Sequence, residues 1–121
     1  MTKPESDGSI KNLKPQWFHI LLCLADRELH GTAIMEEVLE RTDGAVRLWP
    51  GTLYGALGDM AERNLIREVD PPKDAPTEGG KRRFYGITPR GEVTLAREVA
   101  RLEEVLRLAR AKGVGGSLSR A

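Results

Sequence analysis

The chain is poor in cysteine and in long apolar segments. Its single cysteine, Cys23, cannot form an internal disulfide and fits a reducing cytoplasm. No apolar run approaches the roughly 18 residues needed to cross a membrane, so no membrane partner is expected. Residues 1–12 are polar, of mixed charge, and lack the apolar core of a secretory signal. We therefore expect a cytoplasmic protein that begins with a disordered arm over residues 1–12.

Residue types that carry catalysis or bind metals are also scarce. The sequence has two histidines and one cysteine, and it contains no His-x-x-x-His, Cys-x-x-Cys or Gly-x-Ser-x-Gly pattern. The glycine-rich segment at residues 113–116 follows a predicted helix and not a strand, which argues against a dinucleotide-binding loop. Nothing near Cys23 in the sequence would lower the pKa of its thiol, so we expect a core residue and not a redox sensor. The sequence therefore predicts no enzyme, no cofactor and no metal site.

The charge of the chain is nearly balanced but unevenly distributed. A net charge of +1 does not by itself argue for a nucleic-acid partner. Basic residues gather at Lys81-Arg82-Arg83, whereas acidic residues collect on two predicted helices. The basic run is either a solvated loop or a contact for phosphate groups, and composition alone leaves both interpretations open.

Hydrophobic periodicity predicts helices and two short strands. The helices are predicted at residues 15–25, 31–41, 50–63 and 89–111, and the strands at residues 65–69 and 83–87. Prolines at the permitted first helical position, and Thr88 and His30 as caps, support these helix starts.

Three helices followed by a hairpin with a basic tip are typical of a winged helix-turn-helix, in which the third helix enters the major groove. We therefore predict a mainly α protein with a small β-hairpin and a C-terminal dimerisation helix. Its parts are a winged helix DNA-binding domain over residues 13–88 with a wing loop at 70–82, a dimerisation helix over 89–111 and a flexible tail over 112–121.

The predicted third helix has an unusual outer face. An apolar stripe recurs every three or four residues, and glycines gather on the opposite side at about 100° per residue. The stripe consists of Leu53, Leu57 and Met60, and the glycine face consists of Gly51, Gly55 and Gly58. Glycine inside a helix costs roughly 0.5–1 kcal/mol relative to alanine. The glycines therefore indicate a surface kept clear for a bulky partner, and we expect double-stranded DNA.

Contacts to DNA divide into phosphate contacts and base contacts. We expect the start of the third helix and the wing to bind phosphate, and the front of the helix to face the bases. The predicted DNA-binding residues are Gly51, Thr52, Tyr54, Gly55, Lys81, Arg82 and Arg83. Because the front of the helix has no Arg, Lys, Asn or Gln, DNA shape should carry more of the specificity. Thr52 and Tyr54 also have plain structural explanations, as helix-start and packing residues. Trp49 is expected to pack beneath the helix entrance, and stacking on a ligand is the alternative.

Two helices carry more apolar surface than one small domain can cover. The first is apolar around nearly its whole circumference, and the last has a seam with a 4-3-4-3 spacing. A second copy of the chain is the expected cover, with interface residues Trp17, Phe18, Leu21, Leu95, Val99, Leu102 and Leu106. The alternative is a winged-helix module that binds another protein and no DNA, which the acidic second helix and the near-neutral charge permit.

Short segments along residues 13–110 carry a family resemblance. They are Pro15 with Trp17-Phe18-His19-Ile20-Leu21, His30-Gly31 with Ala33-Ile34, Thr42-Asp43-Gly44, Pro50-Gly51-Thr52-Leu53-Tyr54 with Leu57, Leu65-Ile66, Arg82-Arg83-Phe84-Tyr85, and Ile87-Thr88 with Gly91. On these residues the chain resembles the PadR family of transcriptional regulators, in its short branch with a single terminal helix. The resemblance implies a homodimeric repressor of a pseudo-palindromic operator, and in some members release of the DNA by a small aromatic molecule near the dimer centre. Trp17 and Phe18 are the effector contacts that it implies here.

Overall fold

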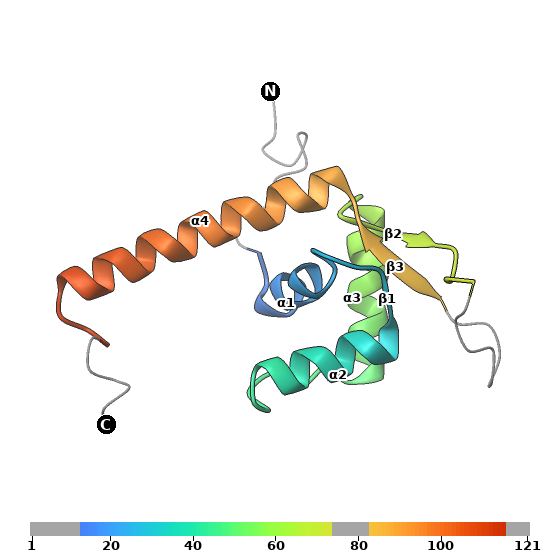
Figure 1. Cartoon of the computed structure of the whole chain (residues 1–121), viewed down its shortest axis with the longest axis horizontal. Coiled ribbons are helices and arrows are strands. Elements are labelled where there is room, and N and C mark those ends of the chain that lie inside the picture. The colour runs from blue at the N-terminus through green and yellow to red at the C-terminus, as the bar shows by residue number, and fades with distance from the viewer. Residues whose placement is uncertain (1–12, 74–82, 116–121) are drawn as a thin grey trace.

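The computed structural model describes residues 13–73 and 83–115 and confirms the predicted class of fold. The elements follow the order α1 (Pro15–Cys23), β1 (Leu29–His30), α2 (Gly31–Arg41), α3 (Pro50–Glu62), β2 (Ile66–Val69), β3 (Phe84–Ile87) and α4 (Pro89–Ala111) (Figure 1). α4 has the predicted bounds, whereas α1 ends at Cys23, before the predicted end at Ala25. The predicted N-terminal arm, most of the wing loop and the end of the tail lie outside the described residues.

Prolines and capping side chains set the helix starts, as predicted. At the start of α2 the His30 Nδ1 atom accepts a hydrogen bond from the Ala33 N–H at 3.2 Å. At the start of α4 the Thr88 hydroxyl accepts one from the Gly91 N–H at 2.9 Å. α1, α3 and α4 each begin with a proline, at a position where a missing N–H costs nothing. These residues are Pro15, Pro50 and Pro89.

The sheet contains a strand that the sequence pattern did not predict. β2 and β3 form the predicted antiparallel hairpin, and β1 pairs with the other edge of β3, in the order β1-β3-β2. Leu29 lies opposite Tyr85, and His30 lies opposite Phe84. Two residues are too few to show a periodic pattern, so only pairing with a distant segment makes β1 a strand.

The core lies among α1, α2, α3 and the start of β2. Its fully enclosed side chains include Ile20, Leu21, Ile34, Val38, Leu53, Leu57, Met60, Leu65 and Ile66. Figure 1 shows α4 passing along α1, with its C-terminal part extending beyond the other helices. The near end of α4 completes this core through Leu95, while the far end of α4 is not covered by the described chain.

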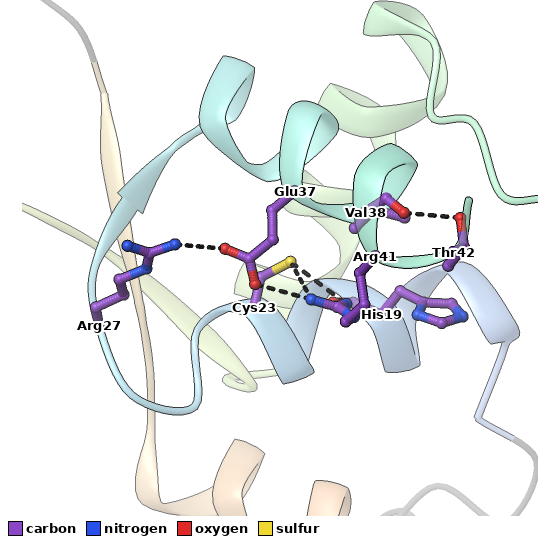
Figure 2. Close-up of polar contacts among 7 residues, drawn as sticks. All are labelled: His19, Cys23, Arg27, Glu37, Val38, Arg41 and Thr42. Atoms are coloured by element: carbon purple, nitrogen blue, oxygen red, sulfur yellow. Dashed lines mark hydrogen bonds and ion pairs between the residues drawn. The ribbon is translucent and has the colours of Figure 1, made fainter. Parts of the chain in front are cut away.

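A polar cluster joins α1 to α2 (Figure 2). The Arg41 guanidinium donates to the Glu37 carboxylate at 2.8 Å, to the His19 carbonyl at 3.2 Å and to the Cys23 sulfur at 3.6 Å. Arg27 donates to the second oxygen of Glu37 at 2.7 Å, and this bond lowers the pKa of that carboxyl group. Arg41 therefore ties the last turn of α2 to α1.

Cys23 is fully buried in this cluster, as expected for a core residue. Burial raises the pKa of its thiol to about 11, although the hydrogen bond from Arg41 acts in the opposite direction. A thiol with this pKa is protonated at neutral pH, and protonated thiols are poor nucleophiles.

A backbone junction joins the end of α3 to the start of α4. Thr88 donates its hydroxyl to the Asn64 carbonyl at 2.6 Å and its N–H to the Leu65 carbonyl at 3.1 Å. Gly91 lies so close to the same Leu65 carbonyl that a Cβ atom at this position would clash with it, and the added atom would also stand 2.8 Å from Ile87. We call the contacts of Leu65, Thr88 and Gly91 the α3–α4 junction. These contacts hold the start of α4 against the residues that follow α3.

The first prediction concerns this junction. Gly91→Ala should lower the free energy of unfolding by about 1–3 kcal/mol, because the added methyl group forces backbone or Ile87 to shift. Urea denaturation followed by circular dichroism measures the change.

Gly58→Ala is the matched control. Gly58 lies within α3 with nothing near its absent Cβ atom, so alanine should stabilise the protein by about 0.5–1 kcal/mol. Equal effects of the two substitutions would show that the α3–α4 junction has no special role.

The second prediction concerns Cys23. Its pKa of about 11, against an ordinary 9.0, reduces the thiolate fraction about 100-fold, and burial blocks access as well. A disulfide reagent at mildly alkaline pH should therefore react at least about 100-fold more slowly with the native protein than with the urea-unfolded chain. Comparable rates in the two states would mean that the thiol is accessible and would reopen a redox role.

Candidate nucleic-acid interface

The outer face of α3 is open, as predicted. Gly51, Gly55 and Gly58 are exposed, and a Cβ atom added to any of them would meet nothing within 4 Å. The opposite face holds the apolar stripe, which is enclosed in the core. α3 is therefore held by one face, and its glycine face is free to approach a large surface closely.

The start of α3 presents backbone donors. The first hydrogen bond of the helix runs from the Leu53 N–H to the Trp49 carbonyl at 2.8 Å, and no side chain caps the helix. The N–H groups of Gly51 and Thr52 therefore lie at the helix end, where partial positive charge accumulates. Both residues are exposed, so this end of α3 is chemically suited to a phosphate group.

Tyr54 joins α3 to α2 while keeping an exposed surface. A Cβ atom at Gly31 would stand 2.5 Å from the Tyr54 hydroxyl oxygen, so the ring rests on the backbone at the start of α2. Tyr54 nevertheless remains 48% exposed. Tyr54 thus both packs and presents polar surface at the corner of the two helices. Sequence spacing gave no signal for the role of Gly31, because the two residues lie on different helices.

The wing lies partly within the described residues. Arg83 is exposed directly before β3. Lys81 and Arg82, which were predicted to contact phosphate with it, lie outside the described residues. The structure therefore places one predicted wing cation, at the base of the wing.

Trp49 does not pack beneath the helix entrance, so this prediction is wrong. The residue is 61% exposed, whereas the neighbouring Leu48 is 3% exposed and fills the core position. The backbone at Trp49 is extended, with φ −80° and ψ 153°, and adjacent side chains of an extended segment point to opposite sides. Arg47 therefore lies on the same side as Trp49, with its guanidinium carbon 5.1 Å from the ring centroid.

The predicted dimer-interface residues fall into two groups. Three are buried within the single chain, which corrects their assignment to the interface: Trp17, Leu21 and Leu95. The physical reason is that α4 packs on α1 in the same chain, and all three side chains belong to the core of that chain. The indole of Trp17 is also covered by cations, with Lys14 at 5.3 Å and Arg63 at 5.7 Å from the ring centroid.

The other predicted interface residues keep accessible surface. Phe18 and Val99 are partly buried, and Leu102 and Leu106 are 39% and 51% exposed. Val105, on the same part of α4, is also exposed, whereas the exposed Leu108 lies on the other side of the helix. Exposed apolar side chains gathered on one helix are typical of an interaction surface.

The described residues show neither a metal site nor a membrane-spanning helix. They contain no group of three or more side chains arranged to hold a metal ion. None of their helices is both long and apolar enough to span a bilayer.

This chain matches a family model and a curated protein over most of its length. Residues 20–97 match the model of the "Transcriptional regulator PadR-like family". A segment of 79 residues is 39% identical to an uncharacterized 37.1 kDa protein in transposon TN4556 of Streptomyces fradiae. That segment is 65% of this chain but only 20% of the relative, so this chain spans about a fifth of that protein's length.

Solved structures share the fold. A PadR family transcription regulator from Clostridium difficile R20291 superposes with a TM-score of 0.68 at 24% identity, covering 81% of this chain and 97% of that one. Bacillus subtilis PadR in complex with operator DNA superposes with a TM-score of 0.61 at 17% identity, covering 71% of this chain and 47% of that one. At these identities the likeness is one of fold.

Proposed function

This chain belongs to the PadR-like family of transcriptional regulators, and we propose that it acts as a homodimeric repressor that binds a pseudo-palindromic operator through α3 and the wing. Members of this family are regulators of transcription and not enzymes. The observation that carries the proposal is the open glycine face of α3 beside uncapped backbone donors at its start. Bacillus subtilis PadR, which has the same fold, forms a complex with operator DNA.

In the proposed complex the start of α3 meets the phosphate backbone. The N–H groups of Gly51 and Thr52 and the hydroxyl group of Thr52 donate to phosphate oxygens. Tyr54 adds a second hydroxyl at the corner of α2 and α3. The wing supplies cations from Lys81, Arg82 and Arg83, of which Arg83 is described.

The same geometry limits how this chain reads bases. Gly55 and Thr52 face outward near the front of α3, and neither can make the bidentate bonds that select guanine or adenine. Thr52 can contact a thymine methyl group. We therefore propose that the sequence preference rests largely on the shape and deformability of the duplex, which the close approach of a bare helix allows the protein to sense.

The proposed dimer is formed by α1 and the far half of α4. Phe18, Val99, Leu102 and Leu106 supply the apolar contacts, and Val105 lies beside them. Two-fold symmetry then presents two α3 helices to half-sites about one helical turn apart, roughly 34–36 Å. A small aromatic effector would bind near the dimer centre beside Phe18, because Trp17 is enclosed within the chain.

The third prediction tests DNA binding. Fluorescence anisotropy with a labelled duplex from the region upstream of its own gene should show binding that weakens as salt rises, because phosphate contacts release counterions. Gly55→Leu should bind at least about 10-fold more weakly, since its side chain keeps α3 away from the groove, while thermal stability is retained or raised because leucine forms helix better than glycine.

Ala100→Leu is the control for added bulk, because Ala100 is exposed on α4 and lies off the apolar seam. It should leave DNA binding unchanged. The contrary outcome is a wild-type chain that binds no upstream duplex at any salt concentration and yet retains a protein partner in a pull-down. That result would instead support the protein-interaction module.

The fourth prediction tests the dimer. Leu102→Glu combined with Leu106→Glu should raise the dimer dissociation constant at least about 100-fold, because charges replace apolar contacts at the centre of the interface. Analytical ultracentrifugation measures the change.

Leu108→Glu is the matched control. Leu108 is 47% exposed but lies about 200° around α4 from Leu106, and so faces away from the proposed interface. It should leave the dimer intact. A strictly monomeric wild-type protein, or a double variant that dimerises as tightly as the wild type, would rule out this interface.

A further inference from the structure

An exposed aromatic–cation pair lies directly before α3. Trp49 is 61% exposed, and the Arg47 guanidinium carbon is 5.1 Å from the centroid of its ring. Both side chains project from the extended segment that leads into Pro50, on the side opposite the buried Leu48. We call these two residues the Arg47–Trp49 pair.

Stability of the fold does not explain the Arg47–Trp49 pair. An exposed indole leaves a large apolar surface in water, and core packing at this point is already supplied by Leu48. A cation close to the start of a helix is also electrostatically unfavourable, because that end carries partial positive charge. In the part of the chain that the structure describes, no carboxylate forms an ion pair with Arg47, and the first turn of α3 has no acidic residue.

We propose that the Arg47–Trp49 pair is an anchor for the sugar–phosphate backbone of the duplex, beside the groove that α3 enters. In this arrangement the Arg47 guanidinium binds a phosphate group and the indole of Trp49 packs on the adjacent deoxyribose. The exposed start of α3 at Gly51 and Thr52 follows the pair directly along the chain, so in the proposed complex one partner contacts both. This inference rests on the proposed function, because it assumes that α3 approaches DNA.

The chemistry of the pair fits this one partner. Guanidinium groups bind phosphate with paired hydrogen bonds, and a cation held over an aromatic ring is already oriented before it binds. The contact carries no base information, so it should strengthen binding to every duplex alike. It also offsets the absence of Arg, Lys, Asn and Gln from the front of α3.

The test measures the salt dependence of binding for Arg47→Ala and Trp49→Ala, by anisotropy with the upstream duplex and with an unrelated duplex. Arg47→Ala should weaken binding to both duplexes about two- to tenfold and reduce the slope of log K against log salt by about 1. Trp49→Ala should weaken both to a similar extent, whereas Trp49→Phe, which keeps a ring beneath the guanidinium, should retain most of the affinity. Arg110→Ala, in the last turn of α4, is the control and should leave the slope unchanged.

A second measurement uses the indole itself as the probe. The chain has two tryptophans, so Trp17→Phe leaves Trp49 as the single emitter. Its emission should change on addition of duplex, with the same midpoint as the anisotropy. If Trp17→Phe fails to fold, the difference between wild type and Trp49→Phe gives the same information, because Trp17 is buried.

The outcomes separate the two claims. Duplex binding with an unchanged Trp49 emission, and an Arg47→Ala slope equal to that of the wild type, would overturn the anchor and leave the proposed function standing. Absence of binding to any duplex would overturn both. Weakening confined to the upstream duplex would show that the pair reads sequence, and would also overturn a backbone anchor.

Discussion

The backbone contact on which the rest of the structure depends is the Leu65 carbonyl within the α3–α4 junction. It accepts the Thr88 N–H and leaves room only for glycine at position 91. Leu65 follows α3 and precedes β2, and Thr88 follows β3 and caps α4, so one carbonyl orients the helix-turn-helix, the wing and the terminal helix together. In a dimer held by α4, this junction would set the separation of the two α3 helices. Spacing on the operator would then depend on backbone packing more than on any exposed side chain.

Contacts on the inner side of the helix-turn-helix hold α3 in place, so its outer face does not need side chains for packing. Arg41 joins α2 to α1 through the Glu37 carboxylate and the carbonyl group of His19. Tyr54 rests on Gly31 and joins α3 to α2. Because these contacts and the apolar stripe position the helix from behind, its glycine face can remain empty. Along the first half of this face a partner then meets the backbone of α3 and a few short side chains, with the larger Glu62 at the far end of the helix.

The sequence predicted the features that depend on local chemistry. Proline and capping residues gave the helix starts, and periodicity gave the buried stripe and the open glycine face of α3. Prediction from the sequence failed where the burial of a side chain depends on which neighbouring element covers it. Trp17 and Leu95 were assigned to a subunit interface because periodicity shows that a face is apolar, but not that α4 of the same chain packs on α1. Trp49 was expected to pack beneath the entrance of α3 because aromatic residues usually pack, whereas Leu48 is the residue buried there.

The same distinction applies to the candidate site. The exposed positions of α3 follow from helical geometry and were predictable, while the contact of Arg47 with Trp49 depends on the backbone angles before the helix. β1 and the close approach of Gly91 to Leu65 depend on segments that meet only after the chain has folded. A pattern within a short window of sequence cannot predict such contacts between distant segments.

The empty flank of α3 separates the evolution of recognition from the maintenance of the fold. A side chain added at position 51, 55 or 58 would contact nothing in the core, so substitutions there leave the packing of the core unchanged. A duplicated gene would therefore be able to acquire a different target through a short side chain at one of these positions, without passing through poorly folded intermediates. Each such substitution would also exchange a helix-weakening glycine for a better helix former, so divergence in recognition would come with a small gain in folding.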